Sequence, residues 1–115
     1  MYAIGGVSGD SVMLPTVDEY DPANDTWTAK ASMPTPRAGP AAGVVNGKVY
    51  VMGGFNGEFL STVEEYDPAG DTWAAKANMP TARVGPVASV VDGIIYVIGG
   101  TGSPGSGSIM EAYDP

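Results

Sequence analysis

Residues 17–54, VDEYDPANDTWTAKASMPTPRAGPAAGVVNGKVYVMGG, return as residues 63–100, VEEYDPAGDTWAAKANMPTARVGPVASVVDGIIYVIGG. The two stretches share 26 of 38 residues without a gap, and equivalent positions lie 46 residues apart. A third copy is split between the two ends of the chain, because residues 1–6 match 49–54 and residues 110–115 match 63–68. A period of about 20 to 50 residues indicates an architecture in which copies of one supersecondary unit stack side by side.

Turn signals divide each unit into four short strands, here called a, b, c and d. Asn46-Gly47 and Asp92-Gly93 lie between apolar runs and predict type I′ hairpin turns, because both central residues of such a turn need positive φ. An Asp-Pro turn joins strands c and d, and the exchange of Asn24 for Gly70 within it predicts left-handed φ at that place. In the complete unit we expect the strands at residues 41–45, 49–52, 63–66 and 72–76.

Four antiparallel strands repeated at this spacing fit the blade of a β-propeller. The chain reads b-c-d, a-b-c-d, a-b-c, which predicts an all-β arc of about two and a half four-stranded blades that does not close a ring on its own. We expect one propeller segment over residues 1–115, made of a partial blade at 1–34, a complete blade at 35–80 and a partial blade at 81–115. An open arc leaves an apolar blade face uncovered at each end, so we expect either a fragment of a larger propeller or self-association into a ring.

The units resemble bacterial-type kelch repeats. The residues that carry the resemblance are Gly53-Gly54 and Gly99-Gly100 after strand b, Tyr66 and Trp73 around the c–d turn, and Arg37 and Arg83 before strand a. The resemblance implies a binding scaffold for a protein or carbohydrate ligand. An alternative that it also implies is a fragment of a sugar-processing kelch enzyme similar to sialic acid mutarotases.

Composition narrows the possible chemistry. The chain carries 13 acidic and 5 basic residues, for a net charge of −8, so nucleic acid and an anionic membrane surface are poor expectations for its partners. No apolar run approaches 18 residues, so membrane insertion is not expected either. It has no cysteine and no histidine, which removes thiolate nucleophiles, imidazole bases and the usual metal ligands. We therefore assign no catalytic residue, no metal site and no cofactor, and we favour a binding module over an enzyme.

Strand direction predicts where a ligand binds. Because strands alternate, the b–c and d–a connections emerge on one side of the arc, here called the loop face, and the b–c loops at 7–16, 55–62 and 101–109 are the segments that vary in length. The two arginines that precede strand a lie on the same side, where they either bind a ligand or donate to backbone carbonyls in the neighbouring blade. The candidate ligand-binding residues are Arg37, Arg83, Phe55, Asn56, Glu58 and Phe59.

Residues that recur at equivalent positions are interpreted first as structural, because they serve every copy of the repeat. Aromatic side chains at these positions are expected to pack between blades rather than to form a sugar platform. The carboxylates of Glu64 and Glu65 are expected on opposite faces of their strand, so they form no acid–base pair. The structural set is Gly5, Gly6, Tyr20, Trp27, Gly53, Gly54, Tyr66, Trp73, Gly99, Gly100 and Tyr113.

Overall fold

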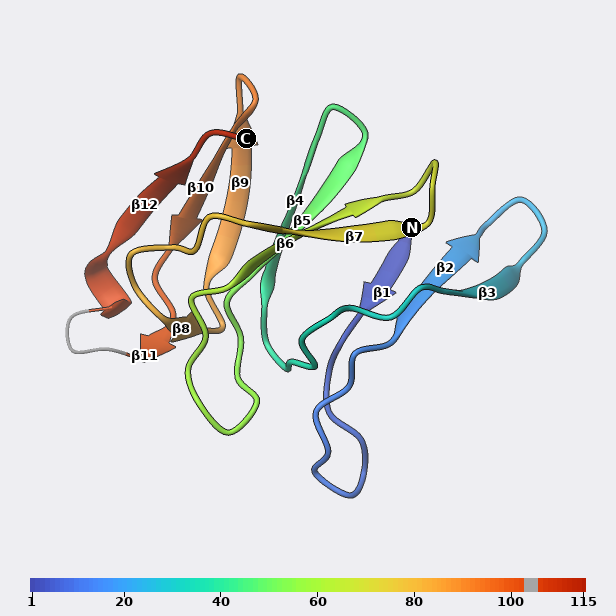
Figure 1. The fold of residues 1–115 in the computed structure, drawn as a ribbon, viewed down its shortest axis with the longest axis horizontal. Helices are drawn as coiled ribbons and strands as arrows, with labels where there is room; N and C mark the ends of the chain where they lie inside the picture. Colours follow the sequence, from blue (N-terminus) through green and yellow to red (C-terminus); the bar gives the residue numbers. More distant parts are fainter. Residues whose placement is uncertain (103–105) are drawn as a thin grey trace.

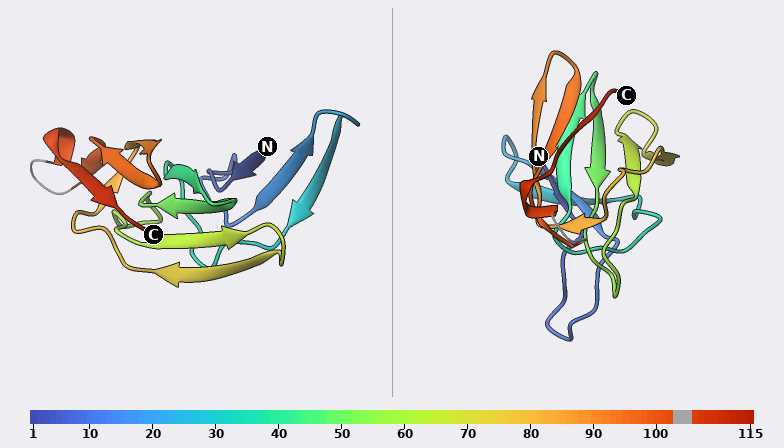
Figure 2. Two further views of the ribbon diagram at one scale, coloured as in Figure 1. Left: turned by 90° about the horizontal axis from the view of Figure 1, so that it is seen from above. Right: turned by 90° about the vertical axis from the view of Figure 1, so that its left-hand side faces the viewer.

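Three small antiparallel sheets follow one another along an arc in the computed structural model, which describes residues 1–102 and 106–115 (Figures 1 and 2). Blade 1 contains β1 (Tyr2–Ile4), β2 (Val17–Asp21) and β3 (Thr26–Lys30). Blade 2 contains β4 (Ala41–Val45), β5 (Lys48–Met52), β6 (Val63–Asp67) and β7 (Thr72–Lys76). Blade 3 contains β9 (Val87–Val91), β10 (Ile94–Ile98) and β12 (Met110–Tyr113). The predicted open propeller arc is confirmed.

Turn chemistry sets the strand boundaries largely as expected. Asn46 has φ of 51° and Gly47 has φ of 75°, so the a–b hairpin adopts the predicted conformation with two left-handed residues. The prediction for the c–d turn was wrong by one residue. Positive φ falls on Asp25 (53°) and Asp71 (51°), one residue after the Asn/Gly exchange, because Asn and Asp also tolerate the left-handed region.

Each pair of neighbouring blades encloses its own apolar cluster. Between blades 1 and 2 the buried residues are Val17, Met33, Val49, Val51 and Tyr66. Between blades 2 and 3 they are Val45, Tyr50, Met52, Val63, Met79, Ile95 and Val97. The repeat places equivalent residues in both clusters, since Val49 and Val51 correspond to Ile95 and Val97 at the 46-residue spacing. The same packing arrangement therefore occurs at both contacts between blades.

The long connections gather on one side of the arc. In Figure 1 the b–c loops of blades 1 and 2 point downward, whereas the a–b and c–d turns point upward. A two-residue strand, β8 (Arg83–Val84), pairs with β11 (Thr101–Gly102) on the same side. The sequence did not predict this pair, because two residues carry no alternation pattern. Part of the third b–c loop, residues 103–105, lies outside the described residues.

Helical structure in the described residues is limited to one 3₁₀ turn, Ser106–Ser108. In this part of the chain no helix has the length and apolar character needed to cross a membrane.

Candidate functional site

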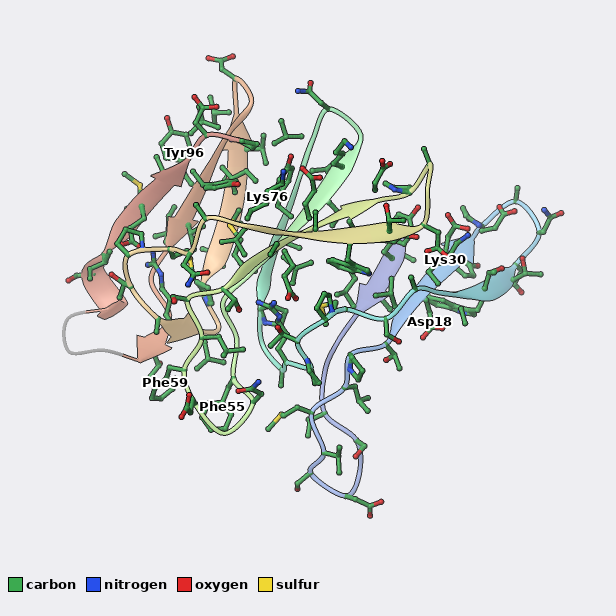
Figure 3. All side chains as sticks on the ribbon, in the orientation of Figure 1. Asp18, Lys30, Phe55, Phe59, Lys76 and Tyr96 are labelled. Atoms are coloured by element: carbon green, nitrogen blue, oxygen red, sulfur yellow. The ribbon has the colours of Figure 1, made fainter. Side chains whose placement is uncertain are left out.

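The second b–c loop is an ordered hairpin rather than a loose connection. The Phe55 N–H donates to the Ala38 carbonyl at 2.9 Å, and the Ala38 N–H donates back to the Phe55 carbonyl at 3.0 Å. The ring of Phe55 lies 5.5 Å from the ring of Phe59 at an interplanar angle of 58°, and Phe59 keeps 44% of its surface exposed. Both rings lie in the lower loop of blade 2 in Figure 3. The backbone bonds fix the loop to the d–a connection, so the aromatic pair has a rigid base.

A cleft opens on the loop face between the b–c loops of blades 1 and 2. Its volume is about 450 Å³, and Phe55, Asn56 and Gly57 line it from blade 2. Ser11 and Met13 line it from blade 1, and Pro36 comes from the d–a connection. Of the predicted ligand-binding residues, the structure brings Phe55 and Asn56 into this cleft. Glu58 and Phe59 come after these residues in the same hairpin, and both are exposed.

The two predicted arginines are completely buried. Arg37 and Arg83 each have 0% relative exposure. Nη1 of Arg37 donates to the carbonyls of Gly53 (2.8 Å) and Thr62 (3.1 Å), which lie at the two ends of the second b–c loop. The guanidinium therefore holds the base of the loop from inside. It bonds backbone carbonyls as the structural alternative expects, but these belong to its own blade and not to the neighbouring one.

A carboxylate on strand c completes this clamp. Nη2 of Arg37 donates to Oε1 of Glu64 at 2.5 Å, and the Thr35 hydroxyl donates to the other oxygen of Glu64 at 2.8 Å. Glu64 is only 5% exposed, and the bonds and the ion pair hold its charge in the blade. The neighbouring Glu65 points elsewhere and accepts a bond from the Tyr50 hydroxyl at 2.6 Å. The two adjacent carboxylates thus have different partners, as the strand pattern predicts.

Blade 3 repeats the clamp with its own residues. Nη1 of Arg83 donates to the carbonyls of Gly99 (3.1 Å) and Ile109 (2.9 Å). Nη2 donates to Glu111 at 2.5 Å, and the Thr81 hydroxyl donates to the second oxygen of Glu111 at 2.9 Å. The repeated arrangement shows that the arginine, threonine and acidic residue form one unit of the repeat.

The arginine backbones also connect neighbouring blades. Gly6 of blade 1 donates its N–H to the Arg37 carbonyl at 2.9 Å, and Gly54 of blade 2 donates to the Arg83 carbonyl at 2.9 Å. A Cβ on Gly53 would lie 2.6 Å from the Arg83 carbonyl oxygen, and φ at Gly53 is +69°. The glycine pair after strand b is therefore required by a close approach of two backbones as well as by its left-handed conformation.

The repeated spacing of tyrosine and tryptophan produces a contact between blades 1 and 2. Trp73 Nε1 donates to the carbonyl of Ala31 at 2.8 Å, and the Ala31 N–H donates to Asp71 at 2.9 Å. Tyr66 is 0% exposed and meets Tyr2 of blade 1 edge-on, with ring centroids 5.7 Å apart. Burial, followed by the hydrogen bond to Asp71, raises the pKa of Tyr66 well above its usual range, so its hydroxyl remains a donor.

Tyr113 and Trp27 occupy the matching positions in the outer blades. Tyr113 meets Tyr50 of blade 2 at 5.9 Å between ring centroids. Trp27 stacks on Tyr20 of its own blade at 4.9 Å but keeps 56% of its surface exposed. The aromatic set therefore packs between blades wherever a preceding blade is present in the structure.

All five basic side chains of the chain form ion pairs with its own carboxylates. Besides the two arginines, Lys30 lies 3.6 Å from Glu19, Lys48 lies 3.2 Å from Asp67, and Lys76 lies 3.6 Å from Glu65. Asp10 and Glu58, which directly adjoin the cleft residues Ser11 and Gly57, are exposed. The loop face therefore presents carboxylates beside the cleft. In the described part of the chain, no group of three or more acidic side chains is placed to hold a metal ion.

The repeat pattern, the glycine pairs and the blade contacts agree with comparison to a known family. A model of the kelch motif matches residues 1–34, 36–80 and 82–115. The chain belongs to the kelch-repeat family. Kelch repeats commonly mediate protein interactions, and this chain contains three matched copies.

Curated relatives match this kelch chain over about half of its length. An F-box/kelch-repeat protein from Arabidopsis thaliana is 44% identical over 54 residues, which cover 47% of this chain and 14% of that protein. Influenza virus NS1A-binding protein homolog B from Danio rerio is 49% identical over 57 residues, which cover 50% of this chain and 9% of that protein. Alpha-scruin from Limulus polyphemus is 40% identical over 54 residues, covering 47% of this chain and 6% of that protein. The matched kelch region is thus a small part of each of these relatives.

Among solved structures, that of YjhT is similar to this chain. The TM-score is 0.67 at 27% sequence identity, and the match covers 84% of this chain and 33% of that chain. The matched part of this chain therefore corresponds to about a third of the YjhT chain.

The sequence did not identify the acidic partner of each buried arginine. A signal was nevertheless present, because an acidic residue recurs at the second position of strand c as Asp18, Glu64 and Glu111. Only the last two have an arginine in the d–a connection before strand a of their own unit. A search for charged residues that recur together would have paired them.

Proposed function

We propose that this kelch arc is a protein-recognition scaffold whose loop face binds a positively charged peptide segment with an apolar anchoring side chain. The observation that carries the proposal is the cleft between the first two b–c loops. Its lining combines Phe55, Met13 and Pro36 with the polar side chains of Ser11 and Asn56. Apolar clefts with a few polar groups are the usual form of a recognition site.

Charge supports the same class of ligand. Every basic side chain is already paired within the chain, whereas Asp10 and Glu58 remain exposed beside the cleft. A basic peptide would gain complementary charge at this rim and faster association at low salt. Phe59, which contacts Phe55, offers an exposed ring at the side of the cleft.

In this proposal Arg37 and Arg83 are positioning residues. Each holds both ends of a b–c loop through two carbonyls, so the loop that carries Phe55 keeps its shape before a ligand arrives. Preorganisation of this kind lowers the entropic cost of binding.

The test is a fluorescence-polarisation screen of the chain against peptides that combine Lys or Arg with one Phe, Leu or Trp. We expect binding that Phe55→Ser and Glu58→Gln weaken by about ten-fold, the effect of losing roughly 1.4 kcal/mol. Asp92→Asn is the matched control, because Asp92 lies in an a–b turn on the opposite side of the arc. Absence of binding by every basic peptide, or equal loss with the control variant, would refute the proposal.

A carbohydrate ligand is the second candidate, and it rests on the polar and aromatic groups at the cleft. Asn56 and Ser11 could donate to and accept from sugar hydroxyls, and Phe55 and Phe59 could stack on a sugar ring. A glycan array with the same variants tests this ligand class. Turnover of a sugar epimer by the chain would favour the sugar-processing alternative over a binding scaffold.

A further inference from the structure

The chain contains two Asn-Gly sequences, and the structure holds them in different backbone conformations. Asn46-Gly47 forms the a–b turn of blade 2, whereas Asn56-Gly57 lies in the second b–c loop and lines the cleft. In an Asn-Gly sequence the glycine nitrogen can attack the side-chain amide of the asparagine, because glycine has no Cβ to hinder the approach. The conformation of each sequence determines whether this attack is possible.

The reaction has a clear geometric requirement. The glycine nitrogen must reach Cγ of the asparagine, so that the nitrogen, the carbonyl carbon, Cα, Cβ and Cγ close a five-membered ring. The glycine nitrogen and Cβ of the asparagine must therefore lie on the same side of the Cα–C bond, nearly eclipsed. A backbone that holds these two atoms on opposite sides of the bond prevents the reaction.

The type I′ turn keeps Asn46 far from this geometry. The φ angle is 51° at Asn46 and 75° at Gly47, and the pairing of Val45 with Lys48 closes the turn. In a type I′ turn the first central residue has ψ of about +30°, which places the glycine nitrogen nearly opposite Cβ across the Cα–C bond. Reaction at Asn46 would therefore require the end of the hairpin to open first.

The backbone around Asn56 is less constrained. Its φ is not positive, unlike that of the a–b turn, and a single isolated bridge between Phe55 and Phe59 closes the loop around it. Within the described residues, neither the side-chain amide of Asn56 nor the N–H of Gly57 has a hydrogen-bond partner. Gly57 has φ of +105°, and no atom lies within 4 Å of the place where a Cβ would stand. Attack by the Gly57 nitrogen therefore breaks no strand pairing.

We propose that Asn56 is a site of spontaneous deamidation, and that this reaction adds a carboxylate to the lining of the cleft. The Gly57 nitrogen loses its proton to a solvent base and attacks Cγ of Asn56. The new N–Cγ bond replaces the Cγ–Nδ2 bond, and Nδ2 leaves as ammonia after taking a proton from water. Water then opens the succinimide. Breaking the N–Cγ bond gives aspartate, and breaking the bond from nitrogen to the main-chain carbonyl carbon gives isoaspartate. Water is the only co-reactant.

Deamidation changes the charge of the cleft. One added carboxylate takes the net charge of the chain from −8 to −9, and it adjoins the exposed Glu58 at the same rim. The aspartate product keeps the backbone unchanged and should bind a basic peptide more tightly. The isoaspartate product lengthens the backbone between Phe55 and Phe59 by one methylene, so it should displace the aromatic pair and weaken binding of an apolar anchor. These effects on binding rest on the proposed peptide ligand, whereas the reaction does not.

The first experiment follows the reaction itself. The full chain is incubated in mildly alkaline buffer, and mass spectrometry of tryptic peptides measures the converted fraction of each asparagine over time. Cleavage after lysine and arginine places each of the four asparagines on its own peptide. We expect Asn56 to convert at least about ten-fold faster than Asn46, because opening of the hairpin adds to the activation barrier at Asn46. Asn24 and Asn78 are internal controls, because neither precedes glycine.

The denatured chain is the matched control for the effect of structure. It keeps both Asn-Gly sequences and removes the turn that protects Asn46. In guanidinium chloride we therefore expect Asn46 and Asn56 to convert at similar rates. Asn56→Gln should abolish the mass change on the peptide that carries residue 56 in the folded chain.

The second experiment measures the effect on binding. Asn56→Asp reproduces the aspartate product, and we expect it to bind a peptide with Lys or Arg beside its apolar anchor about two- to five-fold more tightly at low salt, the effect of one exposed ion pair. Asn46→Asp is the matched control, because it adds the same charge in an a–b turn on the opposite side of the arc (Figure 1).

Each outcome bears on one part of the proposal. Equal conversion of Asn46 and Asn56 in the folded chain, or no conversion at Asn56, would overturn the modification site whatever the chain binds. Conversion at Asn56 together with equal peptide affinities of Asn56→Asp and Asn46→Asp would refute its effect on the cleft. If no basic peptide binds, the loop-face proposal and the effect on binding both fail, and the mass measurement still tests the modification by itself.

Discussion

Replacing Glu64 by glutamine tests whether the buried arginine depends on a buried counter-charge. Glutamine keeps the shape of the side chain and one oxygen that can accept from Arg37, but it replaces the oxygen that accepts from Thr35 by an amide group and removes the negative charge. Arg37 is 0% exposed, so its positive charge would remain in the blade with only carbonyl dipoles around it. The structure therefore predicts that this conservative change lowers the free energy of unfolding by a large amount.

The magnitude follows from the contacts. A hydrogen bond to a charged group contributes about 1.5–3 kcal/mol, and removing one partner of a buried ion pair costs about 3–5 kcal/mol. We expect the free energy of unfolding to fall by about 1.5–3 kcal/mol for Glu64→Gln and by about 3–5 kcal/mol for Glu64→Ala. A domain of this size has roughly 6–17 kcal/mol of stability, so the glutamine variant should still fold.

The assay is urea unfolding followed by circular dichroism, with the free energy taken from the midpoint at constant slope. Asp18→Asn is the matched control, because Asp18 occupies the equivalent position in blade 1 and has no arginine partner among the described residues. It should change the free energy of unfolding by less than about 0.5 kcal/mol. Combining Glu64→Leu with Arg37→Met should cost less than the sum of the single changes, since no unpaired charge remains. Equal effects of Glu64→Gln and Asp18→Asn would refute the reasoning.

Three further predictions concern the contact between blades and the glycine pair. Trp73→Phe removes the bond to the Ala31 carbonyl and should lower the free energy of unfolding by about 1 kcal/mol, whereas Trp27→Phe should leave it nearly unchanged, as measured by urea midpoints. The hydrogen bond from the Ala31 N–H lowers the pKa of Asp71 below its ordinary value of 3.8. The ionised carboxylate therefore stabilises the folded chain fully above the ordinary pKa, and this stabilisation is lost as the pH falls through the lower pKa of the folded state. Acid titration of Asp71→Asn should therefore show a flatter loss of stability below about pH 4 than the unmodified chain, and identical acid limbs would contradict this. Gly53→Ala should cost more than the roughly 1–2 kcal/mol of left-handed strain, because the new Cβ would also lie 2.6 Å from a backbone carbonyl oxygen, and thermal unfolding measures this loss.

The strands and their order could be predicted because the same turn signals occur more than once in the chain. Asn46-Gly47 and its repeat at Asp92-Gly93 mark the a–b hairpin twice, and the 46-residue spacing aligns every other element to that turn. Strand β4 begins and ends where the sequence places it. The left-handed residue of the c–d turn was harder, because Asn, Asp and Gly are adjacent there and all three tolerate positive φ.

The candidate site could be located but not resolved from the sequence. Length variation pointed to the b–c loops, and the structure forms its cleft there, with Phe55 and Asn56 in the lining. The contributions of Ser11 and Met13 from the preceding blade could not be predicted, because they depend on the relative positions of two b–c loops. The burial of Arg37 depends on a pairing with Glu64 over 27 residues, which local patterns do not report.

Repetition separates the residues that support this arc from those that give it specificity. A residue that recurs at the 46-residue spacing finds its partner in its own blade or in the neighbouring one, as Arg37 does in Glu64 and Trp73 does in Ala31. Where the repeat changes, in the b–c loops, side chains extend beyond such contacts, and Phe59 keeps 44% of its surface exposed there. Stability and ligand recognition should therefore respond to separate substitutions: Glu64→Gln should lower the free energy of unfolding, whereas Phe59→Ser should leave it nearly unchanged and weaken binding at the loop face.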